Sequence, residues 1–517
     1  MTDFSNRSRD VFLIQTDMID RGAMMSRYSR TLNLDIRDVY DREFKNNPER
    51  ASNFYKRIFL DYGDESVAEL TTAQLGIQNI SNVLSKVIEE PRIGLSYLEK
   101  SSRYVKYNKK VNGNYLFLPG NEAGISGMQE EYNNLCTELF DFYSTSYPVM
   151  IKYFEQANPP ASFMFEVGGK NYSYDDLKSA DAELLDKSYR SSLRSAVLDE
   201  IRSLLPASTL TNMGLSGNGR AFISLIERLN AYGTPESMKY ADLIYHELEL
   251  ELPELIDDAV TEHGKAQVDY IRARNAIGNN IPFNRTRQEK ITLISYMNED
   301  AAIDVASRLL IYQNTGLYGS DSMTPDQELS VIKEIIAMRG NRRHKIGRAF
   351  ESINYTFEVI MNYGAFREFQ RHRFFSIIRK PLSTDYGYDI PENLAKIPEL
   401  REGYTELMNK AENTYSRIKE RYGVMLAQYV VPYAYKYPVA FTTNLNELAY
   451  FIELRSNPQV HPDLRRVAFD LYDQIRKVHP RLASLIKYID TGEYKLGRLP
   501  AEVRKESKKK SLSGNGN

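Results

Sequence analysis

The sequence is poor in three chemically distinctive residues: its 517 residues include one cysteine, no tryptophan and six histidines. A single cysteine, Cys136, excludes a disulfide within the chain and a zinc site built from cysteines. Cys136 lies in EEYNNLCTELFDFY, which has the apolar spacing of an amphipathic helix. We therefore interpret Cys136 as a core residue rather than a reactive one.

Neither sign of charge dominates, since 67 Lys and Arg stand against 69 Asp and Glu and leave a net charge of −2. This balance argues against general affinity for nucleic acids or membranes. No apolar run approaches the roughly 20 residues that span a bilayer. The first residues, MTDFSNRSRD, lack the basic and apolar regions of a secretory signal. We expect a cytoplasmic protein.

What the sequence does contain is an internal repeat. Three residues recur 282 positions later: Glu69, Ser101 and Tyr104 become Glu351, Ser383 and Tyr386. Three more recur 226 positions later: Pro206, Asn218 and Glu227 become Pro432, Asn444 and Glu453. Such a long twofold repeat predicts a duplicated domain rather than a solenoid.

The Asn- and Gly-rich stretch RNAIGNNIPFNRTRQEK separates the two copies. We predict an N-terminal domain over residues 1–275, a C-terminal domain over 285–503 and a disordered basic tail over 504–517.

Helical spacing of apolar residues dominates both copies. It predicts helices over 66–88, 128–156, 183–204, 236–262, 348–369, 398–429 and 463–486. Shorter β-rich runs, VFLI near residue 11, ITLI near 291 and YLFLP near 115, predict a modest sheet. The expected fold class is α/β (α+β), as two helix-rich copies that form a pseudo-dimer. No GxGxxG motif follows a strand, so a Rossmann cofactor site is not indicated.

The two copies differ where charge matters. At the offset of 282, Arg371-His372-Arg373 aligns with Glu89-Glu90-Pro91, while Ser101-Ser102-Arg103-Tyr104 aligns with Ser383-Thr384-Asp385-Tyr386. Two guanidiniums attract a phosphate that two carboxylates repel. Each copy alone is therefore defective, and the pair suggests a composite site. The alternative is that these charges lie on unrelated surfaces.

These residues resemble the flavin-dependent thymidylate synthases of the ThyX type, whose hallmark is Arg-His-Arg, seven residues and Ser, often continued as Glu-x-Ser-x-Arg-Tyr. Here the Arg-His-Arg stands in one copy, and Glu99-Lys100-Ser101-Ser102-Arg103-Tyr104 stands in the other. Tyr62 to Glu69 is similar to the family's Gly-His-x-Ser-x-x-Glu block, with Asp64 in place of His. Glu453-Leu454-Arg455 and Arg465 resemble the stretch that touches flavin and nucleotide.

The resemblance implies an FAD enzyme that methylates dUMP, with methylenetetrahydrofolate and NADPH as co-substrates. It assigns FAD to Arg371, His372, Arg373, Glu453, Arg455 and Gln459. It assigns dUMP to Glu99, Ser101, Ser102 and Arg103, with Arg103 on the phosphate. Arg465 would polarise the uracil, and Ser101 would bind or orient the nucleotide. A flavin carries the reducing equivalents, so the route needs no cysteine nucleophile.

The sequence departs from the family pattern in two ways. Nine residues, not seven, separate Arg373 from Ser383, and Asp385 replaces the expected Arg. The chain would be a divergent, fused member. Because the family's sites lie between subunits of a tetramer, a fused chain implies a homodimer. Two other hypotheses stay open: a flavoenzyme of the same fold acting on another nucleotide, and a nucleotide-binding protein that has lost FAD.

Overall fold

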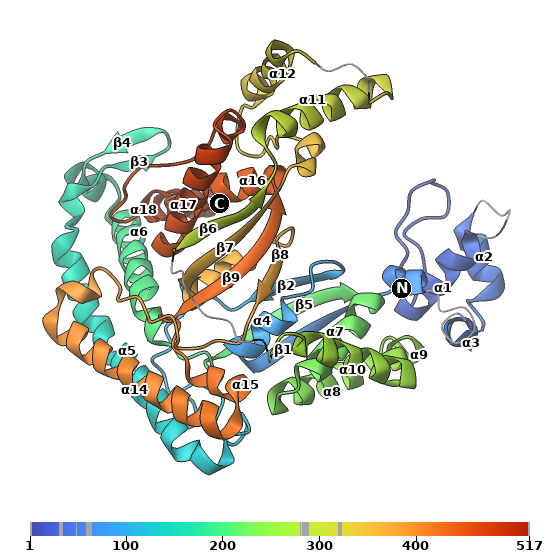
Figure 1. Ribbon diagram of the computed structural model, residues 1–517, viewed down its shortest axis with the longest axis horizontal. Helices are drawn as coiled ribbons and strands as arrows, with labels where there is room; N and C mark the ends of the chain where they lie inside the picture. Colours follow the sequence, from blue (N-terminus) through green and yellow to red (C-terminus); the bar gives the residue numbers. More distant parts are fainter. Residues whose placement is uncertain are drawn as a thin grey trace. The chain divides into compact units, whose positions relative to one another are not determined.

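The computed structural model describes residues 3–29, 31, 35–47, 49–57, 65–279, 281, 289–318 and 323–514 (Figure 1). The chain forms two compact units. The first unit comprises Met1–Lys100, Phe117–Glu130 and Ser208–Thr286, and the second comprises Ser101–Leu116, Glu131–Ala207 and Arg287–Asn517.

These units do not coincide with the domains expected at 1–275 and 285–503, because residues 101–116 and 131–207 belong to the second unit. Backbone hydrogen bonds show why. The amide of Ala207 donates to the carbonyl of Val431 at 2.9 Å, and the amide of Ala434 donates to the carbonyl of Ser203 at 2.9 Å. The end of this insertion is thereby joined to the C-terminal half.

The first unit is built on a three-stranded antiparallel sheet with the order β1-β5-β2. The strands are β1 (Thr72–Ser81), β2 (Leu95–Glu99) and β5 (Leu210–Asn218). Its helices are α1 (Met18–Tyr28), α2 (Ile36–Glu43), α3 (Glu49–Arg57), α4 (Asn82–Ile88), α7 (Gly219–Tyr232), α8 (Pro235–Glu249), α9 (Pro253–Ile256) and α10 (Glu262–Ala276). Apolar residues of α4, α7, α8 and α9 share one core with the inner face of the sheet.

The second unit is built on a four-stranded antiparallel sheet with the order β6-β7-β9-β8. The strands are β6 (Ile291–Tyr296), β7 (Asn354–Asn362), β8 (Ser376–Arg379) and β9 (Lys436–Asn444), and a separate hairpin pairs β3 (Phe165–Val167) with β4 (Lys170–Tyr172). Its helices are α5 (Gln129–Ala157), α6 (Tyr174–Ile201), α11 (Glu299–Thr315), α12 (Pro325–Met338), α13 (Tyr363–Phe369), α14 (Pro398–Tyr422), α15 (Val424–Ala427), α16 (Leu445–Arg455), α17 (Pro462–Val478) and α18 (Leu499–Gly514). Figure 1 shows α16 and α17 beside this sheet, which both helices contact.

The two sheets share one topology, which confirms the fold class of two helix-rich copies with a modest sheet. Strands β1, β5 and β2 correspond to β7, β9 and β8, and β6 is added at one edge. The pair Thr72 and Asn218 in the first sheet matches the pair Asn354 and Asn444 in the second. The offsets of 282 and 226 residues read from the sequence therefore hold at this point.

Several predicted elements are wrong. The segments 66–88 and 348–369 each fold as a 3-10 turn, a strand and a short helix instead of one helix. VFLI and YLFLP form only isolated bridges, Phe4 to Ile14 and Phe117 to Thr209, whereas ITLI begins β6. The tail expected to be disordered from residue 504 continues helix α18 as far as Gly514, and α18 packs on α6.

A β-bulge breaks the constant offset between the copies. The register of β1 on β5 shifts between Ile77 and Ile80, which adds one residue to β1. Within it Asn79 has a left-handed φ of 58°, a conformation that Asn tolerates better than most residues. Ser81 and Asn362 cap the two equivalent helices, α4 and α13, at an offset of 281.

This shift corrects the alignment of the charged tripeptide. At the offset of 281, Arg371–Arg373 corresponds to Glu90–Arg92, not to Glu89–Pro91. Arg371 still aligns with a carboxylate, that of Glu90, but Arg373 aligns with Arg92. By β2 and β8 the offset is 280, since Glu99 and Arg379 occupy the same register. The predicted charge reversal is therefore only partial.

Aromatic rings in the second unit hold the segment after α13 in place. Phe357 and Phe441 stack across β7 and β9 with centroids 5.4 Å apart, and Phe375 stacks on Phe441 at 4.8 Å. The ring of His372 lies 5.4 Å from Phe375 and 4.7 Å from Phe451. His372 is thus part of the core. No helix in the described part of the chain has the length and apolarity needed to cross a bilayer.

Candidate functional site

The Arg371-His372-Arg373 turn connects α13 to β8 in the second unit. His372 is buried, and its Nε2 accepts a hydrogen bond from Nε of Arg455 at 2.8 Å. Its Nδ1 lies 3.4 Å from the carboxylate of Glu447. Burial lowers the pKa of His372 to about 4, against the opposing effect of Glu447. The histidine is therefore neutral at pH 7.

Arg371 and Arg373 flank His372 in the sequence. Arg371 is exposed and Arg373 is half-buried. Phe374, which follows them, is 69% exposed. Two guanidiniums beside an open aromatic ring suit a ligand that carries both phosphate and a planar ring system.

The Ser101-Ser102-Arg103 segment belongs to the same unit as this turn, although it comes from the other copy of the repeat. Arg367 donates from Nη1 to Oγ of the buried Ser102 at 3.2 Å. The amide of Arg103 donates to Oγ of Ser101 at 3.3 Å, which leaves the hydroxyl proton of Ser101 able to donate elsewhere. The last turn of α13 thus holds the serine segment.

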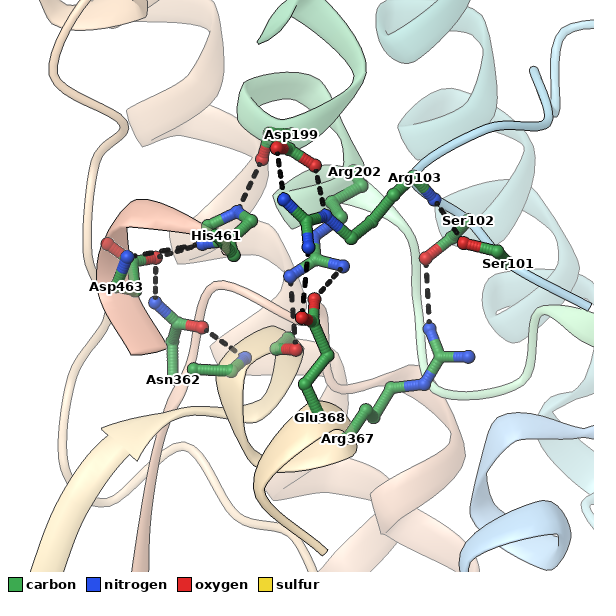
Figure 2. Close-up of polar contacts among 12 residues, drawn as sticks. Ser101, Ser102, Arg103, Asp199, Arg202, Asn362, Arg367, Glu368, His461 and Asp463 are labelled. Atoms are coloured by element: carbon green, nitrogen blue, oxygen red, sulfur yellow. Dashed lines mark hydrogen bonds and ion pairs between the residues drawn. The ribbon is translucent and has the colours of Figure 1, made fainter. Parts of the chain in front are cut away.

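Arg103 is the centre of an ion-pair network (Figure 2). Its Nε and Nη2 donate to the two carboxylate oxygens of Asp199, each at 2.7 Å, and its Nη1 donates to Glu368 at 3.0 Å. Nη2 also donates to the carbonyl of Gln459 at 3.2 Å. Four of its five N–H groups therefore already have acceptors.

The two carboxylates of this network are ionised. Burial alone would raise the pKa of Glu368, but Arg103 and Arg202 lower it to about 2. Arg103 likewise lowers the pKa of Asp199 well below its usual range despite burial. Arg202 lies 3.2 Å from Glu368, and Nε2 of His461 lies 3.0 Å from the carbonyl of Asp199. Sequence reasoning missed these four partners because none belongs to a recognisable motif.

A cavity of about 850 Å³ opens beside the network. Two predicted site residues, Arg103 and Gln459, line it. The other predicted residues of this unit are absent from its lining: Ser101, Ser102, Arg371, His372, Arg373, Glu453, Arg455 and Arg465. The cavity therefore gathers only two of the predicted site residues, and the others lie elsewhere.

The carboxylate of Glu453 is paired within the protein and is not open to a ligand. Arg339 donates from Nη1 and Nη2 to its two oxygens at 2.9 and 2.7 Å, and the amide of Tyr488 donates to Oε1 at 3.1 Å. The pair is almost fully buried. These contacts favour a structural role for Glu453 over the predicted contact with FAD.

Arg465 is also anchored to the backbone. It donates to the carbonyls of Ser456 at 2.6 Å, Asp490 at 2.8 Å and Gly492 at 2.6 Å. Its guanidinium lies over the ring of Tyr494, 5.3 Å from the centroid. Its predicted role on uracil stays a prediction.

Glu99 belongs to the first unit, where it forms a buried triad with Lys86 and Glu89. Nζ of Lys86 lies 3.0 Å from Oε2 of Glu99, and Oγ of Ser85 donates to Oε1 at 3.1 Å. All three charged side chains are at most 1% exposed. In this conformation Glu99 offers no surface to a nucleotide. The predicted block at Tyr62–Asp64 lies outside the described residues.

The family described as "Thymidylate synthase complementing protein" matches residues 20–254 and 292–481. One match falls in each copy of the repeat, and together they cover most of the chain. The chain belongs to this family. The recognised resemblance and the twofold duplication are thereby confirmed.

Relatives in this family fall into two groups. A UPF0159 protein of Thermoplasma acidophilum is 53% identical over 95% of this chain and 99% of its own length. A UPF0159 protein of Chlamydia pneumoniae is 33% identical over 97% of this chain and 96% of its own. The flavin-dependent thymidylate synthase of Saccharolobus solfataricus is 26% identical over 37% of this chain and 74% of its own. The full-length similarity is therefore to UPF0159 proteins.

Proposed function

We propose that this protein is a flavin-dependent thymidylate synthase that converts dUMP to dTMP with methylenetetrahydrofolate and NADPH. Membership of the family supports a nucleotide methyltransferase. The observation that carries the finer proposal is the contact between two motif fragments. Arg103 pairs with Glu368, and Ser102 pairs with Arg367, immediately before the Arg371–Arg373 turn.

In this proposal the turn holds FAD, which supplies the reducing equivalents of the methylation. Arg371, which is exposed, and Arg373, which is half-buried, fit the flavin's pyrophosphate because guanidiniums are planar donors, and the exposed Phe374 follows them. His372 positions this turn as a neutral group of the core. Arg455 supports it by donating to His372.

dUMP would lie next to the serine segment. Ser101 has a hydroxyl proton to donate. Arg103 orients the segment through its bonds to the carboxylates of Asp199 and Glu368. Because four of its five N–H groups are taken, Arg103 offers a phosphate one N–H of Nη1, and a second only if Asp199, Glu368 or Gln459 gives way. Arg465 remains the group proposed to polarise uracil, where it would stabilise negative charge developing on the ring.

The proposal includes a cytoplasmic homodimer, in which the fused copies take the place of the family's subunits. The contact between motif fragments favours dUMP as substrate, but the nine-residue spacing to Ser383 also suits a differently shaped pyrimidine pocket. The second candidate is therefore a flavoenzyme acting on another nucleotide.

The test combines spectroscopy with turnover. The purified protein should be yellow, and should form dTMP from dUMP only when methylenetetrahydrofolate and NADPH are both present. Chromatography of the nucleotides after omission of each component measures this requirement. Bound flavin without dTMP would favour another nucleotide. Absence of both flavin binding and dTMP would favour a nucleotide-binding protein that has lost FAD.

A further inference from the structure

Strand β1 of the first unit has an open edge. Among the strands that the structure describes, β1 pairs with β5 alone, whereas its counterpart β7 lies between β9 and β6. The amide of Gly219 donates to the carbonyl of Thr71 at 2.9 Å. Because bonding alternates along an antiparallel strand, Gln74 and Gly76 turn their backbone N–H and C=O groups away from β5. These groups form a template for a further strand.

The sequence of β1 does not protect this edge over residues 72–77. The stretch TAQLGI contains no charged residue and no proline, which commonly keep an edge strand from pairing. The bulge begins only after Ile77, and there the hydroxyl of Tyr240 donates to the carbonyls of Gln78 and Asn79 at 2.8 and 3.1 Å. The open stretch therefore has the length of β6, which is six residues.

The first copy contains its own counterpart of β6, at residues 11–16. At an offset of 280, VFLIQT aligns with ITLISY. The helices that follow agree with this offset, because three buried positions of α1 have buried counterparts in α11. These pairs are Gly22 and Ala302, Ala23 and Ile303, and Ser26 and Ala306.

Helices α1 and α11 also pack alike within their own units. Helix α1 contacts the 3-10 turn Glu65–Leu70, which precedes β1, and α11 contacts the 3-10 turn Arg348–Ser352, which precedes β7. Only the segment before the helix differs. It forms a strand on β7 in the second copy and does not pair with β1 in the first.

In the described conformation this segment pairs with the first residues of the chain instead. The amide of Ser5 donates to the carbonyl of Leu13 at 3.1 Å, and Phe12 packs against Phe4 with ring centroids 5.6 Å apart. The other face of the segment is left to solvent, since Val11 is 85% and Leu13 is 68% exposed. Two large apolar side chains are thus uncovered next to each other.

The second copy shows what would cover them. The offsets of 280 and 282 convert the register of β6 on β7 into Val11 opposite Ile77 and Leu13 opposite Leu75. Ile77 belongs to the core of the first unit, and Leu75 packs against it. Ile291, which corresponds to Val11, is only 6% exposed on β6. The same position on β1 would bury the face that now meets solvent.

The end of the segment already lies beside the edge. Sδ of Met18, the first residue of α1, is 3.8 Å from Oγ1 of Thr72, the first residue of β1. Residues 11–16 can therefore reach β1 by a rotation just before α1. This short connection gives the chain's own segment a high effective concentration at the edge, which favours it over the segment of a second copy.

We propose that residues 11–16 dock on the open edge of β1 of the same chain, so that the first unit alternates between the described open form and a closed form. The closed form has the sheet order of the second unit, with residues 11–16 in the place of β6. VFLI is apolar on both faces, so the open form buries Phe12 and Ile14, and the closed form buries Val11 and Leu13. This device is independent of the flavin and nucleotide motifs.

An engineered disulfide in the full-length protein tests the docked register. The one native cysteine, Cys136, is buried, so a new pair reports on this contact. Leu13→Cys with Leu75→Cys should form a disulfide within the chain under mild oxidation, because opposite residues of an antiparallel pair have Cα atoms about 4.5–5.5 Å apart. Leu13→Cys with Gln74→Cys is the control, since one residue out of register places the second cysteine on the other face of the sheet.

Thiol titration and a non-reducing denaturing gel distinguish the outcomes. Loss of both new thiols in a monomeric chain, for the Leu75 pair and not for the Gln74 pair, supports the proposal. A disulfide that links two chains would assign the edge to a second copy and overturn docking within the chain. Absence of a disulfide, or equal oxidation of both pairs, would also overturn it.

Hydrogen exchange provides a second test that leaves β1 unaltered. Val11→Asp changes a side chain that is exposed in the open form but buried in the closed form. It should speed exchange of the Gln74 and Gly76 amides by about tenfold or more, because the closed form loses the burial of Val11. Leu250→Asp is the control, since Leu250 is 79% exposed in the same unit and should leave this exchange unchanged. Equal exchange in the native protein and Val11→Asp would contradict the closed form.

Discussion

Arg455 donates its Nε–H to Nε2 of His372 across 2.8 Å, so the histidine in the middle of the basic tripeptide is a hydrogen-bond acceptor at that nitrogen. Protonation of Nε2 would set a second cation against Arg455. Together with burial, this explains why the pKa of His372 falls to about 4. The tripeptide carries two charges rather than three.

This arrangement predicts a loss of stability in mild acid. The unfolded histidine takes up a proton near pH 6.5, whereas the folded one does so only near pH 4. The stabilisation is therefore complete above pH 6.5 and declines as the pH falls toward 4, by about 3 kcal/mol at most. Urea unfolding at pH 7 and pH 5 should show this decline.

His372→Gln keeps an acceptor for Arg455 but cannot titrate, so its unfolding free energy should change less between these two pH values. His246→Gln is the matched control, because His246 is 60% exposed at its side chain and should leave the pH dependence as it is. Equal slopes for the native protein and His372→Gln would contradict the assignment.

The network around Arg103 predicts a large cost for removing one carboxylate. Glu368→Gln leaves Arg202 without its carboxylate partner and Arg103 with Asp199 alone. Removing one partner of a buried ion pair lowers the free energy of unfolding by about 3–5 kcal/mol. Thermal or urea unfolding should show a loss of this size, and Arg103→Met combined with Glu368→Gln should cost less than the sum of the single changes.

Glu183→Gln provides the comparison for an exposed pair. Glu183 pairs with Lys187 on α6, and both side chains are more than half exposed. Its loss should cost less than about 1 kcal/mol. Similar costs at Glu368 and Glu183 would mean that the buried network contributes no more than a surface contact.

The buried triad of the first unit gives a third prediction. Lys86→Met leaves Glu89 and Glu99 together in a site with no exposure to water. We expect a loss of about 3–5 kcal/mol, because both carboxylates lose their buried cation. Adding Glu89→Gln and Glu99→Gln should restore much of this stability, as measured by thermal unfolding. A triple variant no more stable than Lys86→Met would argue that packing, not charge, governs the site.

The repeat and the family could be predicted from the sequence because they rest on identities at fixed spacing. The bulge could not, since the additional residue of β1 shows only in the register of this strand on β5. Segment 348–369 was predicted as one helix because its apolar residues fit a helical spacing, yet strand β7 buries every second residue from Tyr355 to Met361 on one face. A short apolar run can fit both the helical period of about 3.6 residues and the strand period of about two.

The candidate site was only partly within reach of the sequence. Arg103 and the Arg371–Arg373 turn were found as motifs. The structure brings the segment that contains Arg103 beside α13, the helix that precedes the turn. Asp199 and Arg202 lie in an insertion whose pattern is an ordinary helix. Their role depends on Glu368, which lies far away in sequence, so no local pattern could indicate it.

The corrected alignment sharpens the prediction for flavin. The first unit has Glu90 where the second has Arg371, although Arg92 takes the place of Arg373. If the flavin's pyrophosphate needs both guanidiniums, only the second unit is competent, and the purified protein should hold about one FAD per chain. Arg371→Ala should remove most of this flavin, whereas Arg92→Ala should leave it in place, as measured by absorbance against protein concentration. A ratio near two, or flavin lost equally from both variants, would contradict the assignment of FAD to the second unit alone.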